Sequence, residues 1–272
     1  MLERPLVPIL DHDPTEPSVF LPENLIESAR RQKGLAPCKV PAACLLDFDG
    51  EIVEHVLTIG RAKPDVSWPC FHTRLYRCKN GADEFGIIGG IIGAPFAVLV
   101  AEELFASGCR ALVSIGSAGL VAVDLQPPFF LLIERALRDE GTSYHYSSPA
   151  PFVEADRDVL DRVQAQLARA GIPVKRGTTW TTDAPFRETQ GRIADCRRRG
   201  VAAVEMEAAA LLALAAARKR KVVCLSHVTN RMATQANDFD KGGRGGRELA
   251  LRICEEAVRA IIAIASEVRT KK

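Results

Sequence analysis

The sequence predicts an α/β protein with a largely parallel sheet that is covered by helices on both faces. Short β-branched and apolar runs alternate with helical segments along most of the chain, and parallel strands joined by helical crossovers produce this alternation. The 272 residues can bury a sizeable core. No linker, internal repeat or low-complexity segment interrupts the chain, so we predict an N-terminal arm over residues 1–41 and a single domain over residues 42–272.

The predicted elements follow one another in a regular order. The arm is rich in proline, and only residues 23–32 of it are expected to form a helix. Each predicted strand is a short apolar run, and these runs cover residues 43–48, 85–92, 110–116, 129–137, 172–180, 201–204 and 221–228. Helices are predicted at residues 52–57, 94–108, 156–170, 188–199, the alanine–leucine run before residue 221, and about 247–268. Gly108 and Gly200 each close a helical segment, since glycine readily takes the left-handed conformation that ends helices.

Composition and charge exclude several classes of protein. Hydrophobic residues make up 47% of the chain and charged residues 26%, which is typical of a globular protein. The formal net charge of +2 is far from the strongly basic balance of a nucleic-acid-binding protein. Basic clusters at residues 197–199 and 218–221 follow helical stretches, where cations interact favourably with the helix dipole. No nucleic-acid partner is therefore predicted.

The sequence shows no sign of secretion or of a membrane span. The N-terminus lacks an apolar signal core, and no apolar run approaches the ~20 residues that a membrane span needs. The eight cysteines have no C-x-x-C spacing and several lie in apolar runs, which is typical of reduced core cysteines in a cytosolic protein. We therefore expect a soluble cytoplasmic protein with no membrane partner, no disulfide frame and no metal site.

Two glutamates lie where an apolar strand turns into an alanine–leucine helix, at Glu205 and Glu207. Charged groups are rarely buried without partners, so these carboxylates cap the helix, lie exposed at the sheet edge or bind a ligand. They are two residues apart on an extended segment and so face the same way. Ligands of parallel sheets bind beyond the carboxyl ends of the strands, and four further segments deliver small or polar residues there: 116–119, 138–146, 181–189 and 229–231. The gathering of these small and polar residues at one edge of the sheet favours a ligand site.

Other conspicuous residues have simpler interpretations. The glycine run at residues 89–93 lacks the G-x-G-x-x-G spacing, and no acidic residue follows a second strand at the place that a nicotinamide site requires. We interpret these glycines as positions where the backbone packs closely or approaches a ligand. His227 lies inside an apolar strand and is predicted to be structural, whereas His145 is either a loop histidine or a substrate contact.

Four motifs occur in order along the chain: GIIGAPFAVLVAEELFASGCRALVSIGSAGLV (90–121), RDEGTSYHY (138–146), TTDAPFRET (181–189) and VEMEAAAL (204–211). Through them, residues 42–265 resemble the nucleoside phosphorylase/uridine phosphorylase family, which also contains nucleosidases. The resemblance implies a three-layer α/β/α sandwich around a central mixed, partly barrel-like sheet. It also implies a homo-oligomer, a dimer or a hexamer, with active sites near the subunit interfaces.

The resemblance also implies which residues bind substrate. VEMEAAAL is close to the family's sugar-binding signature, GSAG to its phosphate and ribose loop, and TTDAPFRET to its base-binding loop. Gln190 and Arg192 resemble a Gln-x-Arg pair of the uridine branch, displaced by about one residue. The candidate substrate-binding residues are Glu205, Met206, Glu207, Ser117, Ala118, Gly119, His145, Thr182, Asp183, Phe186, Gln190 and Arg192.

The chemistry of nucleoside cleavage accounts for these residue types. Breaking a ribosyl C–N bond passes through an oxocarbenium-like sugar, in which hydrogen bonds to the 2-hydroxyl strengthen. Glu207 can accept from the 2′ and 3′ hydroxyls, and Met206 supplies an adaptable apolar surface for the sugar. The leaving base becomes negative, and the family pattern places Asn230 and Arg231 beside it. The candidate catalytic residues are therefore Asn230, Arg231 and Glu207, with uridine or inosine favoured over adenosine.

Two departures from the family pattern fall on its phosphate site. The loop Gly-Asp-Pro-x-x-Arg is replaced by DFDGEI at residues 47–52, and a second phosphate arginine is replaced by Ser114. The acids of this loop repel phosphate unless cations arrive from elsewhere, such as Arg74 or Arg77 of a neighbouring subunit. The candidate phosphate-site residues are Ser114, Ser117, Asp49 and Arg74.

Three functions follow from these observations. The first is phosphorolysis of a nucleoside, with inorganic phosphate as co-substrate and no organic cofactor. The second is hydrolysis, with a water positioned by one of the acids within residues 47–51. The third is a catalytically quiet protein that binds a nucleoside and has lost its nucleophile site.

Overall fold

A ten-stranded sheet forms the centre of the computed structural model, which describes residues 7–81, 83–231 and 243–270 of the chain, the last with side chains only over residues 246–265. The strands are β1 (Ala43–Asp47), β2 (Ala62–Pro64), β3 (Tyr76–Asn80), β4 (Asp83–Gly89), β5 (Ala111–Leu120), β6 (Phe129–Asp139), β7 (Phe152–Glu154), β8 (Lys175–Thr182), β9 (Val201–Glu205) and β10 (Lys221–Asn230). The α-helices are α1 (Pro22–Lys33), α2 (Glu51–Thr58), α3 (Ala94–Ala106), α4 (Arg157–Arg169), α5 (Gln190–Arg198), α6 (Ala208–Arg218) and α7 (Gly243–Thr270). Single 3₁₀ turns are η1 (Pro8–Leu10), η2 (Thr142–His145) and η3 (Pro185–Arg187).

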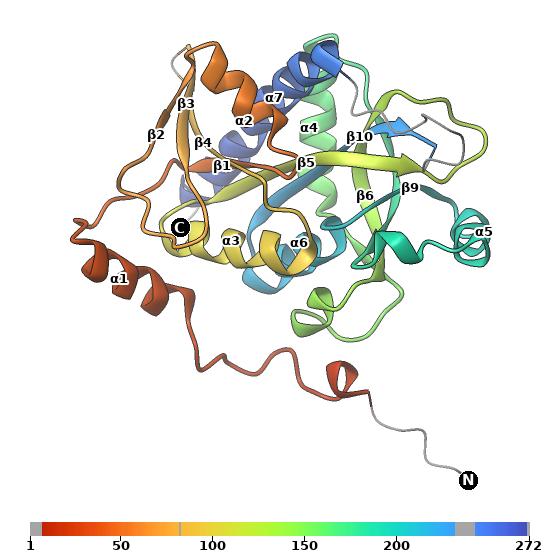
Figure 1. Ribbon diagram of the computed structural model, residues 1–272, viewed down its shortest axis with the longest axis horizontal. Coiled ribbons are helices and arrows are strands. Elements are labelled where there is room, and N and C mark those ends of the chain that lie inside the picture. The colour runs from red at the N-terminus through yellow and green to blue at the C-terminus, as the bar shows by residue number, and fades with distance from the viewer. Residues whose placement is uncertain (1–6, 82, 232–242, 271–272) are drawn as a thin grey trace.

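Half of the sheet closes on itself. The strand order is β10-β6-β8-β9-β5-β1-β4-β3-β2, and β10 also pairs with β5, so that β5, β10, β6, β8 and β9 form a five-stranded, barrel-like ring. Strands β1, β4, β3 and β2 extend from β5 as an open wing, seen at the left of Figure 1, and β7 pairs with β6 of the ring. This arrangement confirms the mixed, partly barrel-like sheet that the family resemblance implies.

Helices cover both faces of the sheet and complete three layers. Helices α3 and α6 lie on one face, and α2, α4 and α7 lie on the other (Figure 1). Each face has its own apolar core, since the largest cluster of buried residues lies beneath α3 and α6 and the next beneath α2, α4 and α7, with a smaller third cluster around α5. Helix α6, with the sequence AAALLALAAAR, is built of small and apolar residues and buries its first seven completely. The three-layer α/β/α prediction is confirmed.

The prediction of a largely parallel sheet is wrong, because only half of the ten strand pairings are parallel. The antiparallel pairings come from the β2–β3–β4 meander, from β7, and from the two contacts that close the ring, β10 with β6 and β9 with β5. The strands β2, β3 and β7 are absent from the prediction because their sequences AKP, YRCKN and FVE are short or polar.

The predicted strand at residues 85–92 ends early, at Gly89, and a loop of residues 90–93 follows it. In the arm, α1 ends at Gly34 in the left-handed conformation and packs against α3. The boundary between arm and domain at residue 41 stays a prediction. All eight cysteines are free, and seven of them are buried. No helix within the described ranges is long and apolar enough to cross a membrane.

Candidate active site

The candidate site lies where β5 changes its strand partner. On one edge, β5 pairs with β1 up to Ile115, and it pairs with β9 from Gly119 onward. Between these two contacts, Gly116, Ser117 and Ala118 present an edge that neither strand covers. On its other edge β5 stays paired with β10, whose Asn230 is the register partner of Gly119. Crevices where neighbouring strands diverge are the usual ligand sites of α/β sheets.

A cleft of about 370 Å³ lies at this break, which is within the usual size of small-molecule sites. Segments that are far apart in the sequence meet there, namely the β1–α2 loop, the loop before α3, β5, η3, the β9–α6 junction and the end of β10. The lining residues are Phe48, Asp49, Ile92, Gly116, Ser117, Ala118, Gly119, Pro185, Phe186, Glu188, Val204, Glu205, Met206, Glu207 and Asn230.

Glu205 caps helix α6 from the end of β9. One carboxylate oxygen accepts from the backbone N–H groups of Glu207 and Ala208 at 2.8 and 2.6 Å, and the other accepts from Thr181 Oγ1 at 2.5 Å. Thr181 Oγ1 in turn accepts from the N–H of Ala209 at 2.9 Å. These contacts satisfy N–H groups that a helix start leaves without intrahelical partners. Burial raises the pKa of Glu205 above its usual range, against the lowering effect of its hydrogen bonds.

Glu207 is held differently, by the glycine loop that precedes α3. Its Oε1 accepts from the backbone N–H of Gly93 at 2.7 Å, and Oε2 accepts a longer bond from Met206 N–H at 3.3 Å. The left-handed φ of +97° at Gly93 suits glycine and turns its N–H toward the carboxylate. Burial, then the neighbouring charges of Glu205 and Asp49, raise the pKa of Glu207 to about 8. The free protein therefore carries a largely protonated Glu207 at neutral pH.

This raised pKa predicts a pH-dependent activity. A sugar hydroxyl donates to a carboxylate better than to a carboxylic acid, so deprotonation of Glu207 increases the productive fraction of the protein. We expect kcat/KM to rise with pH and to level off above an apparent pKa near 8, because kcat/KM reports groups of the free enzyme. The measurement is kcat/KM between pH 5.5 and 9.5, at steps of about half a unit. The Glu207→Gln variant is the control, and persistence of the same rise in that variant contradicts the assignment.

Asn230 ends β10 inside the cleft. Its side chain is buried at 6% exposure, and its Nδ2 donates to Thr229 Oγ1 at 3.1 Å. Because Gly119 is the register partner of both Asn230 and Val204, the ends of β9 and β10 flank the same point of β5 from opposite sides. Arg231, one residue further, does not line the described cleft, and its Nη2 donates to Gln126 Oε1.

Asp49 approaches the uncovered edge of β5 from the loop after β1. Its Oδ2 accepts from the backbone N–H of Ser117 at 2.6 Å, and its Oδ1 accepts from Ser117 Oγ at 3.1 Å. The loop is fixed on both sides of Asp49: Phe48 N–H donates to the carbonyl of Ile115, and Gly50 turns the chain with a φ of +79°. The sequence predicts Asp49 as a phosphate-site residue, and the structure shows its carboxylate hydrogen-bonded to Ser117.

The segment around η3 forms a further wall of the cleft. Phe186 is 99% exposed, so one aromatic face is available for a planar ligand. Glu188 also lines the cleft, and burial raises its pKa to about 7. Sequence reasoning missed Glu188 because it looked for a Gln-x-Arg pair. The sequence signal that could have identified Glu188 is its carboxylate within the TTDAPFRET loop.

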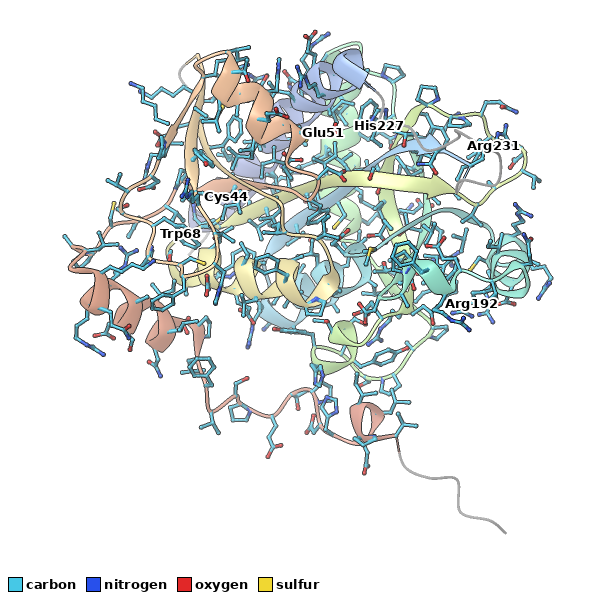
Figure 2. The ribbon with its side chains drawn as sticks, in the orientation of Figure 1. Cys44, Glu51, Trp68, Arg192, His227 and Arg231 are labelled. Carbon is cyan, nitrogen blue, oxygen red and sulfur yellow. The ribbon has the colours of Figure 1, made fainter. Side chains whose placement is uncertain are left out.

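Several predicted site residues lie outside the described lining of this cleft. Arg192 forms an ion pair with Asp139 at 3.0 Å and lies at the α5 end of the molecule, on the right of Figure 2. His145 stacks on His12 of the arm at 5.1 Å between ring centroids. Arg74 lines a different pocket, which the ends of α1 and β2 also line. Those left outside the lining are Gln190, Arg192, His145, Thr182, Asp183, Ser114, Arg74 and Arg231.

The segment at residues 138–146 lies outside the described lining of the cleft. Strand β6 runs antiparallel to β10, so its carboxyl end lies away from Asn230. It runs parallel to β8 instead, with Asp139 opposite Thr182. The carboxylate of Asp183 accepts there from the N–H of Gly141 at 2.8 Å. The carboxyl end of β6 thus shares an edge with those of β8 and β9, since Thr181 is in turn the register partner of Glu205, although no residue of 138–146 is in the described lining of the cleft. In the described part of the chain, no group of three or more His, Cys, Asp or Glu side chains is arranged to hold a metal ion.

The fold and the cleft together define an α/β enzyme with its ligand crevice at diverging strand ends. Residues 42–267 match the family model of the Phosphorylase superfamily. The chain belongs to this family, and it is an enzyme of the pentosyltransferase class.

Three named relatives are similar to this protein over 62–83% of the chain. A uridine phosphorylase from Thermococcus kodakarensis is 28% identical, over 83% of this chain and 84% of its own length. A purine nucleoside phosphorylase of the DeoD type from Exiguobacterium sp. is 27% identical, over 68% of this chain and 84% of its own. A guanosine phosphorylase from Halorubrum lacusprofundi is 25% identical, over 62% and 73%. The crystal structure of uridine phosphorylase from Vibrio fischeri ES114 has the same fold, with a TM-score of 0.67, 20% identity and coverage of 84% of this chain and 93% of that one.

Proposed function

We propose that the protein cleaves the N-glycosidic bond of a nucleoside by transferring its pentosyl group to a small acceptor. One observation carries the proposal: Glu207, Asn230 and the Ser117–Gly119 edge come from three distant segments and meet in one cleft of a Phosphorylase superfamily member. The names of the relatives, which are uridine, purine nucleoside and guanosine phosphorylases, support a nucleoside as substrate. They also support phosphate as the family's usual acceptor.

In the proposed mechanism, the ribose lies on the β9 side of β5 and the base lies on the β10 side. The ribose lies against Met206, and its 2′ and 3′ hydroxyls donate to the carboxylate of Glu207, where the contact strengthens as positive charge develops on the sugar. The base lies toward Asn230 and the exposed ring of Phe186. As the C1′–N bond breaks, the electron pair moves into the base, and Asn230 donates a hydrogen bond to the base oxygen that becomes more negative.

The experiment is a panel of nucleosides incubated with the purified protein, with and without phosphate. Free base is measured by chromatography, and the sugar product is identified as ribose or ribose 1-phosphate. Release of base from at least one nucleoside supports the proposal. Binding of nucleosides without any release of base supports the catalytically quiet alternative and contradicts the proposed activity.

The base contacts predict a substrate preference. An amide such as Asn230 donates to a carbonyl oxygen but cannot protonate a leaving nitrogen at neutral pH, so we expect uridine and inosine to react better than adenosine. One mismatched polar contact is worth about 1–3 kcal/mol, which is roughly a 5- to 150-fold difference in kcat/KM. The measurement is kcat/KM for the three nucleosides under identical conditions. Asn230→Asp is the matched variant, because it adds a group that can share a proton, and it should favour adenosine. Adenosine as the best substrate of the unaltered protein contradicts this account.

A further inference from the structure

We propose that the cleft prefers nucleosides whose base is a heteroaromatic cation, such as an N-ribosylpyridinium, and that Glu188 and Phe186 select this charge. This inference rests on the proposed function and names the substrate class of the same cleft. Three observations carry it: the carboxyl group of Glu188, the exposed ring of Phe186 and the charges of the remaining walls.

The first observation is that Glu188 brings a carboxyl group without a partner to the wall of the cleft. The residue is half-buried and lines the cleft, and its backbone N–H donates to the carbonyl of Pro185 at 3.4 Å. Within the described ranges, its side chain makes no hydrogen bond or ion pair with another residue, and burial alone raises its pKa to about 7. A carboxylate that has lost water without gaining a partner is stabilised by a ligand that brings positive charge.

The second observation is the ring of Phe186, which lines the same cleft and is 99% exposed. The face of an aromatic ring carries negative potential, so it attracts cations as well as planar groups. Glu188 follows the 3₁₀ turn η3, to which Phe186 belongs, so the ring and the carboxyl group are parts of one wall. This wall therefore offers both kinds of group that bind a planar cation, an aromatic face and a carboxylate.

The third observation concerns the charges of the other walls. The described lining of the cleft contains no lysine, arginine or histidine. Backbone N–H groups hold the carboxyl groups of Glu205 and Glu207, at the start of α6 and in the loop before α3. Asp49 is hydrogen-bonded to β5 and shares a small cavity with Arg247. Of the four carboxyl groups in the lining, that of Glu188 is therefore the one that a ligand can pair without displacing another contact.

The charged side chains near Glu188 in the sequence lie outside the described lining. Asp183 accepts from a backbone N–H of the loop after β6, and Arg187 is exposed. Arg192 forms its ion pair with Asp139 at the α5 end of the molecule (Figure 2). None of these groups contributes to the raised pKa of Glu188, whose cause is burial. The ionised form of Glu188 thus remains a charge for a ligand to compensate.

The charge of the base also decides how a carboxylate beside it affects the reaction. A neutral nucleoside gives a base that becomes negative as the C1′–N bond breaks, and an ionised Glu188 does not stabilise that charge. In an N-ribosylpyridinium, the electron pair of this bond neutralises the ring nitrogen, so the base leaves as a neutral molecule and needs no proton. The oxygen of the acceptor forms the new bond to C1′, as in the proposed function. A carboxamide oxygen on the pyridine ring can still accept from Asn230.

The first test compares two stable probes that differ in charge: 1-methylnicotinamide, a cation, and nicotinamide, which is neutral. Their dissociation constants are measured by NMR titration, which needs no turnover. At about pH 8.5 we expect the cation to bind about tenfold more tightly, which is within the range of cation–π contacts. At about pH 6 the difference should shrink, because Glu188, with its pKa of about 7, is then mostly protonated and neutral. Equal binding of both probes at the higher pH overturns the inference.

The second test uses substitutions in the wall. Glu188→Gln keeps the size of the side chain and removes its charge, so the preference for the cationic probe should disappear. The same variant should lower kcat/KM for nicotinamide riboside more than kcat/KM for uridine, and comparing each substrate with itself cancels its intrinsic reactivity. Phe186→Leu should weaken binding of the cation by about 2- to 30-fold, the range of cation–π contacts. Glu54→Gln, on the exposed side of α2, is the matched control and should keep the preference.

The outcomes separate this inference from the proposed function. Equal losses for nicotinamide riboside and uridine in Glu188→Gln overturn the selection by charge, and a cation preference that survives in this variant overturns the role of Glu188. If the variant does not fold, the pH dependence of the two probes in the unaltered protein still decides. Tighter binding of the cationic probe, without release of base from any nucleoside, contradicts the proposed function and supports the charge preference of the cleft.

Discussion

Replacing Glu207 by glutamine is expected to lower kcat/KM for a ribonucleoside by about 10²-fold or more, because the lost contact to the ribose hydroxyls is stronger in the transition state than in the bound substrate. The fold should survive the change. Glutamine keeps an oxygen for the N–H of Gly93, and removing a buried carboxyl whose pKa is raised to about 8 removes a group that weakens folding as it ionises. The raised pKa means that the stabilising, protonated form is complete below pH 4.5 and is lost as the pH rises through about 8.

The 2′-hydroxyl itself provides the control for Glu207. Uridine and 2′-deoxyuridine are compared in the unaltered protein and in Glu207→Gln. This comparison is a double-mutant cycle, in which one change is the substitution in the protein and the other is the loss of the 2′-hydroxyl from the substrate. If Glu207 binds the 2′-hydroxyl, the substitution should matter less for the deoxynucleoside. Equal losses for both substrates contradict the hydroxyl contact, and near-original turnover of uridine removes Glu207 from the site.

Replacing Glu205 by alanine is expected to destabilise the protein by about 2–4 kcal/mol, although the residue is only two positions from Glu207. The change leaves two backbone N–H groups and the Thr181 hydroxyl without their buried acceptor. Each unsatisfied group of this kind costs about 1–3 kcal/mol, and water that hydrogen-bonds to these groups reduces the total cost. For a protein of this size the midpoint of thermal unfolding should fall by roughly 5–15 °C. The measurements are thermal unfolding for the midpoint and urea unfolding for the free energy, both followed by circular dichroism.

Glu207→Gln is the matched control for this stability experiment, since both glutamates are buried at the same helix start. The capping role predicts that only the substitution at Glu205 shifts the unfolding midpoint strongly. Equal free energies of unfolding for Glu205→Ala and the unaltered protein would show that the carboxylate does not hold α6 in place.

The order of elements could be predicted from the sequence because apolar runs and glycine stops mark most strands and helices of the layers. What could not be predicted from the pattern was strand direction in the ring. The apolar run of β6 does not reveal that it pairs antiparallel with β10 at Phe129–Leu132 and parallel with β8 along its length. Consequently the sequence pattern does not show that the carboxyl end of β6 lies beside that of β8 and away from that of β10. Closure of the ring is a long-range contact that leaves no local signature.

Site residues could be predicted from the sequence where the residue type itself limits the chemical role. The Glu205–Glu207 pair was recognised as a ligand or capping position, and the structure shows that Glu205 caps α6 while Glu207 lines the cleft beside Asn230. The bond between Asp49 and Ser117 joins residues that are 68 positions apart, and no spacing rule reveals it. The pKa of Glu188, which burial raises to about 7, could not be predicted from the sequence because burial is set by the folded environment.

The closure of the ring also bears on how copies of this protein can associate. Among the described strands, only β2 and β7 have a single strand partner, and each is three residues long. β2 ends in an exposed lysine and a proline, a combination that blocks the addition of another strand. The described strands therefore offer little edge for intermolecular β-pairing, the contact through which aggregates grow. Self-association has to rely on helix and loop surfaces, whose side chains allow a defined stoichiometry.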